Sequence, residues 1–346
     1  MIKRIIFLVE STFNKRDYER FGIALLQKNG FEVEVWDCTP IFQPDYYKSY
    51  TPPDLFKFEG LKFFNNRKEL FSKLLRLKND DFIMLMGFKN IIYFDIHKAL
   101  SKSKAEYAVF MANALPKSEE SVAIKFKSNF KKLLNLKKVF RFLASRLLLK
   151  FSKIRPTRFV LVGGRKSIEK SYLIGKDTEM IWTHTLDYDL YLKEKARKAK
   201  TRNIAVFLDQ YLPFHPDWVR LGVAGKLDAD RYYKLINYLF DLVEEKTGWK
   251  VVIAAHPRSK YEEHPECWGR RKWYKDKTIQ LVSQAKFVIA QNSTSINFAN
   301  LFNKPIIFIN DVELNKILFS CYLIKMIAEM HGKKQIFIDR QEELNK

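Results

Sequence analysis

Two polar turns in the second half of the chain have side chains suited to binding a phosphate. The apolar run 249–255 leads directly into His256, and the apolar run 287–291 leads into a turn of Asn, Ser, Thr and Ser. An imidazole can donate a proton or a hydrogen bond to a phosphate, and hydroxyls at a helix start can hold the same group together with free N–H groups. Either turn alone is as well explained by a helix cap or a loop start, but the pair favours a site. The residues of the two turns are His256, Pro257, Arg258, Asn292, Ser293, Thr294 and Ser295.

Two carboxylates are candidates for a general base that deprotonates an attacking hydroxyl. Asp209 ends the apolar run that begins at residue 203, and Glu10 follows the apolar run 3–9. A carboxylate within reach of a reacting hydroxyl can take its proton in the transition state. For Glu10 a second interpretation stays open, because a carboxylate at the start of a helix is stabilised by the helix dipole alone.

Strands that alternate with helices must position these side chains. Strands are expected at 3–9, 31–37, 81–88, 105–112, 158–164, 203–209, 249–255, 287–291 and 305–310, and helices at 17–28, 231–246 and 296–302. Such alternation predicts parallel sheets, in which ligands bind at the carboxyl ends of the strands. We therefore expect an α/β protein with two doubly wound, Rossmann-like domains, residues 1–198 and 199–346. Asp209, His256 and the Ser-rich turn would face one crevice of the second domain.

The composition is that expected of a cytosolic, globular protein. The 346 residues are 47% apolar, and no apolar run reaches the roughly 18 residues of a membrane-spanning helix. The first apolar stretch meets Glu10 too early for a signal peptide. Three scattered cysteines suit neither a disulfide framework nor a structural zinc site. Walker, nucleophile-elbow, HExxH and CxxC motifs are missing from the sequence, which argues against P-loop NTPases, serine hydrolases and simple zinc enzymes.

The charge indicates an anionic partner. Lys and Arg number 62 against 39 acidic residues, a net charge of +23. The segment 124–155 has no acidic residue, and its apolar residues recur at steps of three and four between lysines and arginines. This pattern predicts a basic amphipathic helix that lies on an anionic membrane, although a helix packed on its own domain is equally compatible with it. Nucleic acid is the weaker alternative, because the aromatic and basic segment 268–277 can stack on bases but no nucleic-acid-binding motif accompanies it.

The sequence AHPR at 255–258, followed by AKFVIAQNSTSINFANLFNKPIIFI at 285–309, resembles GT-B glycosyltransferases of bacterial capsule and lipooligosaccharide biosynthesis. Within them it is most similar to the sialyltransferase and Kdo-transferase group, which uses CMP-activated ulosonic acids. The resemblance implies two domains facing across a cleft and a His-Pro and Ser/Thr site for the nucleotide and its phosphate. It also implies a carboxylate base, for which Asp209 and Glu10 are the candidates. The paired acidic residues and glycine of those sialyltransferases are missing here, and FLDQ at 207–210 is the nearest substitute.

The expected function is therefore transfer of a sugar from a nucleotide sugar to a glycan or lipid-linked glycan acceptor, without a metal or other cofactor. The enzyme would lie on the inner face of the cell membrane, bound through the segment 124–155. A polyol-phosphate transferase of the CDP-glycerol type shares the His-Pro and Ser-rich arrangement and is the enzymatic alternative. A non-catalytic membrane-binding or nucleic-acid-binding protein explains the charge, but it leaves the His, Asp and Ser residues without a role.

Overall fold

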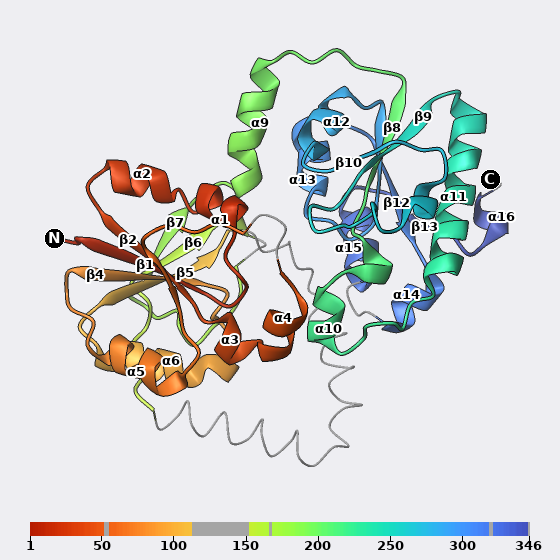
Figure 1. Ribbon diagram of the computed structural model, residues 1–346. Helices are drawn as coiled ribbons and strands as arrows, with labels where there is room; N and C mark the ends of the chain where they lie inside the picture. The colour runs from red at the N-terminus through yellow and green to blue at the C-terminus, as the bar shows by residue number, and fades with distance from the viewer. Residues whose placement is uncertain (52–54, 113–151, 166–167, 318–320, 345–346) are drawn as a thin grey trace. The chain divides into compact units, whose positions relative to one another are not determined.

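The computed structural model describes residues 1–51, 55–112, 152–165, 168–317 and 321–344 (Figure 1). The chain divides into two compact units, Met1–Leu186 and Asp187–Lys346. Of the basic segment predicted at 124–155, only the last four residues are described, so its predicted helix lies outside the described residues. None of the helices in the described ranges is both long and apolar enough to cross a membrane.

The first unit contains a seven-stranded, wholly parallel sheet in the order β3-β2-β1-β4-β5-β6-β7. Its strands are β1 (Arg4–Val9), β2 (Glu32–Asp37), β3 (Leu61–Phe63), β4 (Asp81–Met86), β5 (Glu106–Met111), β6 (Phe159–Val162) and β7 (Glu179–Trp182). Its helices are α1 (Lys15–Arg20), α2 (Ile23–Lys28), α3 (Thr39–Phe42), α4 (Pro44–Ser49), α5 (Arg67–Leu75), the 3-10 turn η1 (Ile91–Tyr93) and α6 (Phe94–Lys102).

Alternating residues of β1 bury into two separate cores. Ile6 and Leu8 join a cluster that includes residues of α5 and α6, whereas Phe7 and Val9 join a cluster on the other face with residues of α1 and α2. Figure 1 shows α5 and α6 on one side of the sheet and α2 on the other. Because successive side chains of a strand point to opposite faces, a strand that is apolar throughout requires helices on both sides. The first unit is therefore doubly wound.

The second unit contains a six-stranded parallel sheet in the order β10-β9-β8-β11-β12-β13. Its strands are β8 (Ile204–Leu208), β9 (Lys250–Ala254), β10 (Trp273–Tyr274), β11 (Phe287–Ala290), β12 (Ile306–Asn310) and β13 (Gln335–Phe337). Its helices are α9 (Leu186–Ala196), α10 (Asp217–Leu221), α11 (Ala229–Thr247), α12 (Thr278–Gln284), α13 (Ile296–Leu301), α14 (Val312–Ile317), α15 (Cys321–Met330) and α16 (Gln341–Leu344), with 3-10 turns η3 (Leu212–Phe214) and η4 (Pro265–Trp268).

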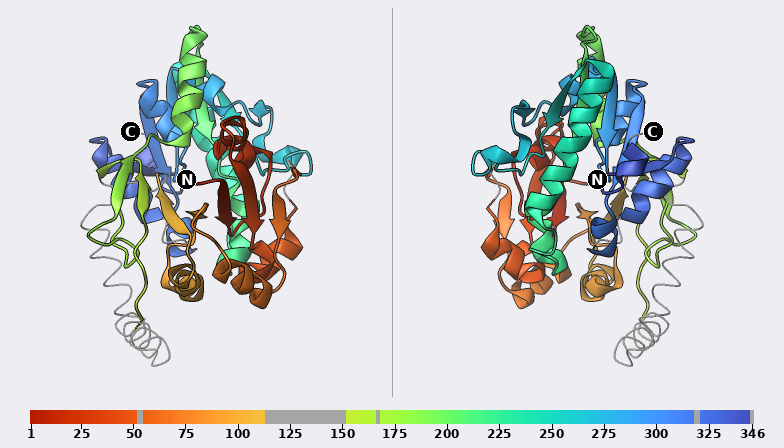
Figure 2. Two further views of the ribbon diagram at one scale, coloured as in Figure 1. Left: turned by 90° about the vertical axis from the view of Figure 1, so that its left-hand side faces the viewer. Right: turned by 90° about the vertical axis from the view of Figure 1, so that its right-hand side faces the viewer.

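Helix α11 is the longest helix of the second unit and runs along its sheet (Figure 2). It begins where the Asp228 carboxylate accepts the backbone N–H of Arg231 at 3.1 Å, and it ends at Gly248 with φ of 69°. Both are ordinary helix boundaries, an acidic N-cap and a left-handed glycine after the last turn. Tyr232 and Ile236 lie on its buried face. The helix thus delivers the chain directly into β9, the strand that precedes His256.

The predicted α/β class with two doubly wound domains is confirmed, since each unit has a parallel sheet whose strand order reverses along the chain. The division between the units lies at residues 186 and 187 instead of 198 and 199, because α9 packs on the second unit. There Ser283 donates to the Glu194 carboxylate at 3.3 Å, and the rings of Tyr191 and Phe302 are 5.0 Å apart. The single helix expected at 17–28 is wrong, because Gly22 adopts φ of 67° and separates α1 from α2.

Candidate functional site

The direction of the strand order reverses between β8 and β11 in the second unit. The chain passes from β8 outward to β9 and β10, then returns to place β11 on the other side of β8. In doubly wound sheets, ligands bind outside the carboxyl ends of the strands at such a switch point. Gln210 follows β8 and its Nε2 donates to the backbone oxygen of Asn292, which follows β11. The two loops at the switch point are therefore bonded to each other.

Asp209 is buried directly after β8, and its carboxylate bonds to the backbone. Oδ1 accepts the N–H of Tyr211 at 2.8 Å, and Oδ2 accepts the N–H of His256 at 3.0 Å. Burial raises the pKa of Asp209 to about 6, although these hydrogen bonds and one from the Tyr261 hydroxyl oppose the rise. Since each carboxylate oxygen accepts a backbone N–H, the side chain holds the loops after β8 and β9 in one arrangement.

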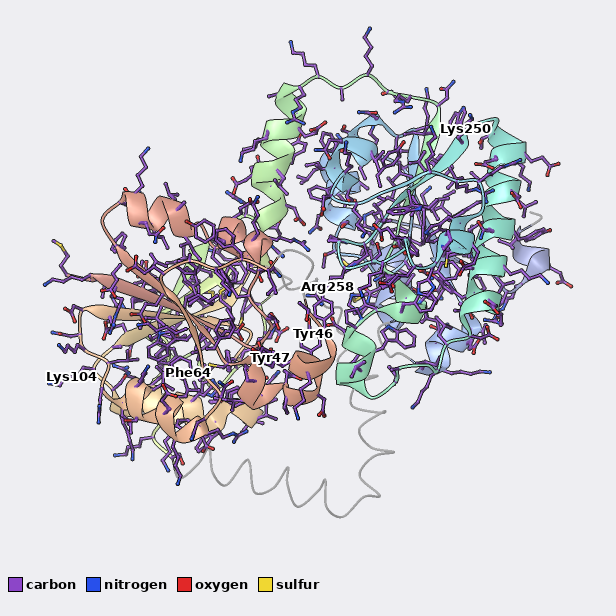
Figure 3. The ribbon with its side chains drawn as sticks, in the orientation of Figure 1. Tyr46, Tyr47, Phe64, Lys104, Lys250 and Arg258 are labelled. Atoms are coloured by element: carbon purple, nitrogen blue, oxygen red, sulfur yellow. The ribbon has the colours of Figure 1, made fainter. Side chains whose placement is uncertain are left out.

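His256 begins the loop after β9, as expected, and its ring is held by that loop. Its Nδ1 accepts the backbone N–H of Arg258 at 3.2 Å. A neutral imidazole has one donor and one acceptor nitrogen, so an accepting Nδ1 requires the proton to be on Nε2. Figure 3 shows Arg258 and Lys250 at opposite ends of β9, which places the His-Pro-Arg turn at the carboxyl edge of the sheet. His256 therefore presents a donor nitrogen rather than a base.

A second His-Pro turn, which the sequence analysis left unassigned, packs against the first. His215 follows η3, and its Nδ1 accepts the backbone N–H of Asp217 at 3.1 Å. The His215 and His256 rings meet edge to face with centroids 4.8 Å apart. Arg258 Nη1 donates to Asp217 Oδ1 at 3.1 Å. The sequence contains a signal, because His-Pro followed by a charged residue occurs at 215–217, 256–258 and 264–266, but the pattern alone does not separate His215 from His264.

The Ser-rich turn lies between β11 and α13. Ser293 Oγ accepts the backbone N–H of Ser295 at 3.2 Å, and Thr294 is exposed. Ser295 is the N-cap residue of α13 and makes no side-chain capping bond, so neither Ser293 nor Thr294 caps this helix. Before the turn, Gln291 is fully buried and its Oε1 accepts the Tyr232 hydroxyl at 2.8 Å. Gln291 Nε2 and Asn292 Oδ1 are buried polar atoms that have no hydrogen-bond partner within the described structure.

Glu10 lies at the corresponding position of the first unit, where β1 and β4 adjoin at the reversal of the strand order. The Tyr93 hydroxyl donates to Glu10 Oε2. Gly87, which follows β4, has φ of 112°, and a Cβ there would be 2.8 Å from Glu10 Oε1. The glycine thus allows the loop after β4 to approach the carboxylate closely.

The second unit brings together most of the residues predicted from the sequence. Asp209, His256 and Arg258 belong to one hydrogen-bonded set, and Gln210 connects it to the Ser-rich turn, whereas Glu10 belongs to the other unit. Pro257 lies between the two bonded residues of its turn. Across the described ranges of the chain, no three side chains of His, Cys, Asp or Glu are grouped as metal ligands would be.

Comparison with known proteins shows likeness in structure but not in sequence. No protein-family model matches the chain, and no curated protein matches it in sequence. The calicheamicin glycosyltransferase CalG4 shares 10% identity, covers 99% of this chain and 87% of its own, and has a TM-score of 0.49. MurG of Acinetobacter baumannii is 11% identical to this chain, the match covers 99% of this chain and 89% of MurG, and the TM-score is 0.48. UDP-N-acetylglucosamine 2-epimerase from Rickettsia bellii is 9% identical, the match covers 90% of this chain and 79% of the epimerase, and the TM-score is 0.43.

Proposed function

We propose that this protein is a glycosyltransferase that binds a nucleotide sugar at the carboxyl edge of the second sheet and transfers the sugar to a cell-surface glycan. The observation that carries the proposal is the fixed orientation of His256 beside the switch point of a doubly wound domain. A buried carboxylate that holds one loop's backbone costs desolvation free energy. This desolvation cost is expected where a loop must hold a side chain in one orientation for a ligand.

The proposed reaction needs charge stabilisation on one side and proton removal on the other. The acceptor hydroxyl attacks the anomeric carbon, the bond from that carbon to the phosphate oxygen breaks, and its electron pair leaves with the nucleotide. His256 Nε2–H and the hydroxyls of Ser293, Thr294 and Ser295 would donate to the phosphate as its charge develops. Arg258 would add a positive charge, part of which Asp217 compensates.

The base that takes the hydroxyl proton is proposed to be Glu10 rather than Asp209. Asp209 is buried, and each of its oxygens accepts a backbone N–H, so it suits a positioning role. Glu10 follows β1 at the switch point of the first unit and is bonded to Tyr93.

The finer identity of the donor rests on the sequence resemblance. A CMP-activated ulosonic acid, such as a sialic-acid-like sugar or Kdo, is proposed as the donor, and the acceptor as a glycan or lipid-linked glycan at the inner face of the membrane. Thermal unfolding of the full chain with CMP, CDP and UDP tests the donor, because a ligand at 100 times its Kd stabilises the folded state by about 2.7 kcal/mol.

The outcomes of this nucleotide panel separate the candidates. CMP alone raising Tm supports the ulosonic-acid donor, and CDP alone indicates the polyol-phosphate alternative. UDP alone keeps the glycosyltransferase proposal and overturns the choice of nucleotide. If none of the three raises Tm at millimolar concentration, the site does not bind nucleotides and a non-catalytic role of the basic chain becomes the better explanation.

A further inference from the structure

Two of the three His-Pro turns of the second unit, 215–217 and 256–258, have the same local geometry. In each, the histidine Nδ1 accepts the backbone N–H of the residue two positions later, at 3.1 Å for His215 and 3.2 Å for His256. Each turn therefore fixes its own ring and requires the proton of the neutral ring to be on Nε2. The chain thus builds two imidazole donors in the same way, from loops that follow two neighbouring strands.

The two turns are also joined to each other at three places. The rings are in edge-to-face contact at 4.8 Å, and the Arg258 guanidinium bonds to the Asp217 carboxylate at 3.1 Å. Below them, Asp209 accepts the N–H of Tyr211 in the loop of the first turn and the N–H of His256 in the second. A histidine that merely filled space would need none of these links. They hold both rings in a fixed mutual orientation.

We infer that His215 is a second phosphate-binding residue, so that the paired turns 215–217 and 256–258 hold one phosphate or diphosphate group between two neutral imidazole N–H donors. The inference rests on the proposed nucleotide site and adds His215 to it as a phosphate-binding residue, which the sequence resemblance does not assign. Neutral donors fixed in advance can hydrogen-bond an anion without reorganising, and the nearby Arg258 supplies the positive charge.

The electrostatic surroundings of His215 favour the neutral form. The pKa of His215 is lowered to about 4, mainly by burial; the Asp217 carboxylate opposes this shift and the Arg258 guanidinium adds to it. With the neighbouring His256 ring, these are the titratable and charged groups that contact the His215 turn in the described structure. His215 is therefore uncharged near neutral pH, and it would bind the anion by donating a hydrogen bond, not through its charge.

The test uses the full chain and inorganic pyrophosphate, with CMP, CDP and UDP in parallel, measured by calorimetry. His215→Phe retains a ring of similar size for the contact with His256 but removes the N–H donor, and His215→Gln restores a donor in a side-chain amide. Since hydrogen bonds to charged groups are the stronger class, His215→Phe should weaken pyrophosphate binding about 10-fold or more, and His215→Gln should recover part of the loss.

The matched control is His264→Phe in the same unit. The ring of His264 stacks on that of Phe214, the residue that precedes His215, with centroids 4.1 Å apart, and His264 lies outside the proposed phosphate site. This variant should bind pyrophosphate as the wild type does. Equal affinity of His215→Phe and wild type would overturn the inference, as would an equal loss in His264→Phe.

Two further outcomes separate this inference from the proposed function. If a nucleotide binds equally to wild type and His215→Phe, the inference fails while the nucleotide site stands. If pyrophosphate binding depends on His215 but none of the nucleotides binds, the paired site stands and the proposed function fails. Should the substitutions unfold the chain, as Tm would show, the ring ¹⁵N and Nε2–H signals of His215 in the wild type decide. They must shift when pyrophosphate is added, and unchanged signals refute the inference.

Discussion

At the scale of single residues, each unit has a buried aspartate that accepts a backbone N–H from the loop after a neighbouring strand. Asp209 accepts the N–H of His256, and Asp37, which ends β2, accepts the N–H of Phe13 at 3.0 Å in the loop that follows Glu10. Burial raises the pKa of both carboxyl groups. In each case a buried acid at a strand end bonds to the backbone of a neighbouring strand's loop. The candidate functional residue of each unit lies on, or next to, the loop so held.

The first prediction concerns His256. Its Nε2–H is proposed to stabilise the phosphate as the sugar leaves, so His256→Ala should lower kcat by about 100-fold or more. Tm should change little, because the hydrogen bond that His256 Nδ1 accepts comes from within its own turn. Transfer by this variant at a rate near that of the wild type would remove the histidine from the mechanism.

The second prediction separates the two carboxylates. Glu10→Gln should abolish transfer and leave nucleotide affinity unchanged, because the base acts on the acceptor. Asp209→Asn should weaken nucleotide binding, because its amide nitrogen cannot accept a backbone N–H and the His256 loop must move. Calorimetry and transfer assays on both variants measure this. Loss of transfer with intact nucleotide affinity in Asp209→Asn would restore Asp209 as the base.

At the scale of elements, the loop after β4 connects the core of the first unit to Glu10. His97, fully buried in α6, has its Nε2 2.7 Å from the backbone oxygen of Phe88, and its Nδ1 is 2.6 Å from the Tyr172 hydroxyl. These contacts fix the loop one residue after Gly87, whose missing side chain leaves room for the Glu10 carboxylate. The position of Glu10 therefore depends on packing that comes from β4, α6 and a later segment of the chain.

The third prediction follows from this loop. Gly87→Ala would place a methyl group 2.8 Å from Glu10 Oε1 and would strain a backbone at φ of 112°. Transfer should fall at least 10-fold, as expected when a catalytic group is displaced, while nucleotide binding to the second unit stays as in wild type. Gly30→Ala is the control, since Gly30 also has positive φ but nothing lies within 4 Å of its Cβ position. Equal losses of transfer in the two variants would mean that backbone strain alone explains the effect.

Elements with long apolar runs could be predicted from the sequence, and the shortest ones could not. The strand predicted at 203–209 appears as β8, because all five of its residues are buried and only a central parallel strand buries both faces. β10 has two residues and β13 has three, so no periodicity marks them, and they are defined by pairing with β9 and β12. At the site, strand ends predicted Asp209 and His256. His215 was missed because it follows a 3-10 turn, and its role depends on a contact with a residue 41 positions away, as in the Asp217–Arg258 bond.

At the scale of the whole molecule, the net charge of +23 is the property that the site explains least. The fourth prediction is that the full chain sediments with anionic vesicles at low salt and is released as salt rises, since near-surface cations contribute about 1 kcal/mol each. Changing Lys131, Lys132, Lys137 and Lys138 to Glu should weaken sedimentation but not transfer to a soluble acceptor. Neutral vesicles are the control. If the wild type ignores anionic vesicles, or if the four changes lower Tm strongly, the segment 124–155 is a packed part of the fold.

Within the second unit, the segment between α9 and β8 is basic and exposed. After α9 the residues Arg197, Lys198, Lys200 and Arg202 are all exposed, and β8 begins only at Ile204. Trypsin cuts after lysine and arginine in accessible backbone, so brief digestion should cut here and release a fragment that starts between residues 198 and 203. Mass spectrometry would identify the cut. If that fragment remains folded and still binds the nucleotide, the donor half of the protein can be studied on its own. If the fragment loses its structure instead, the sheet of the second unit needs α9, which packs on it through Glu194 and Tyr191, to stay folded.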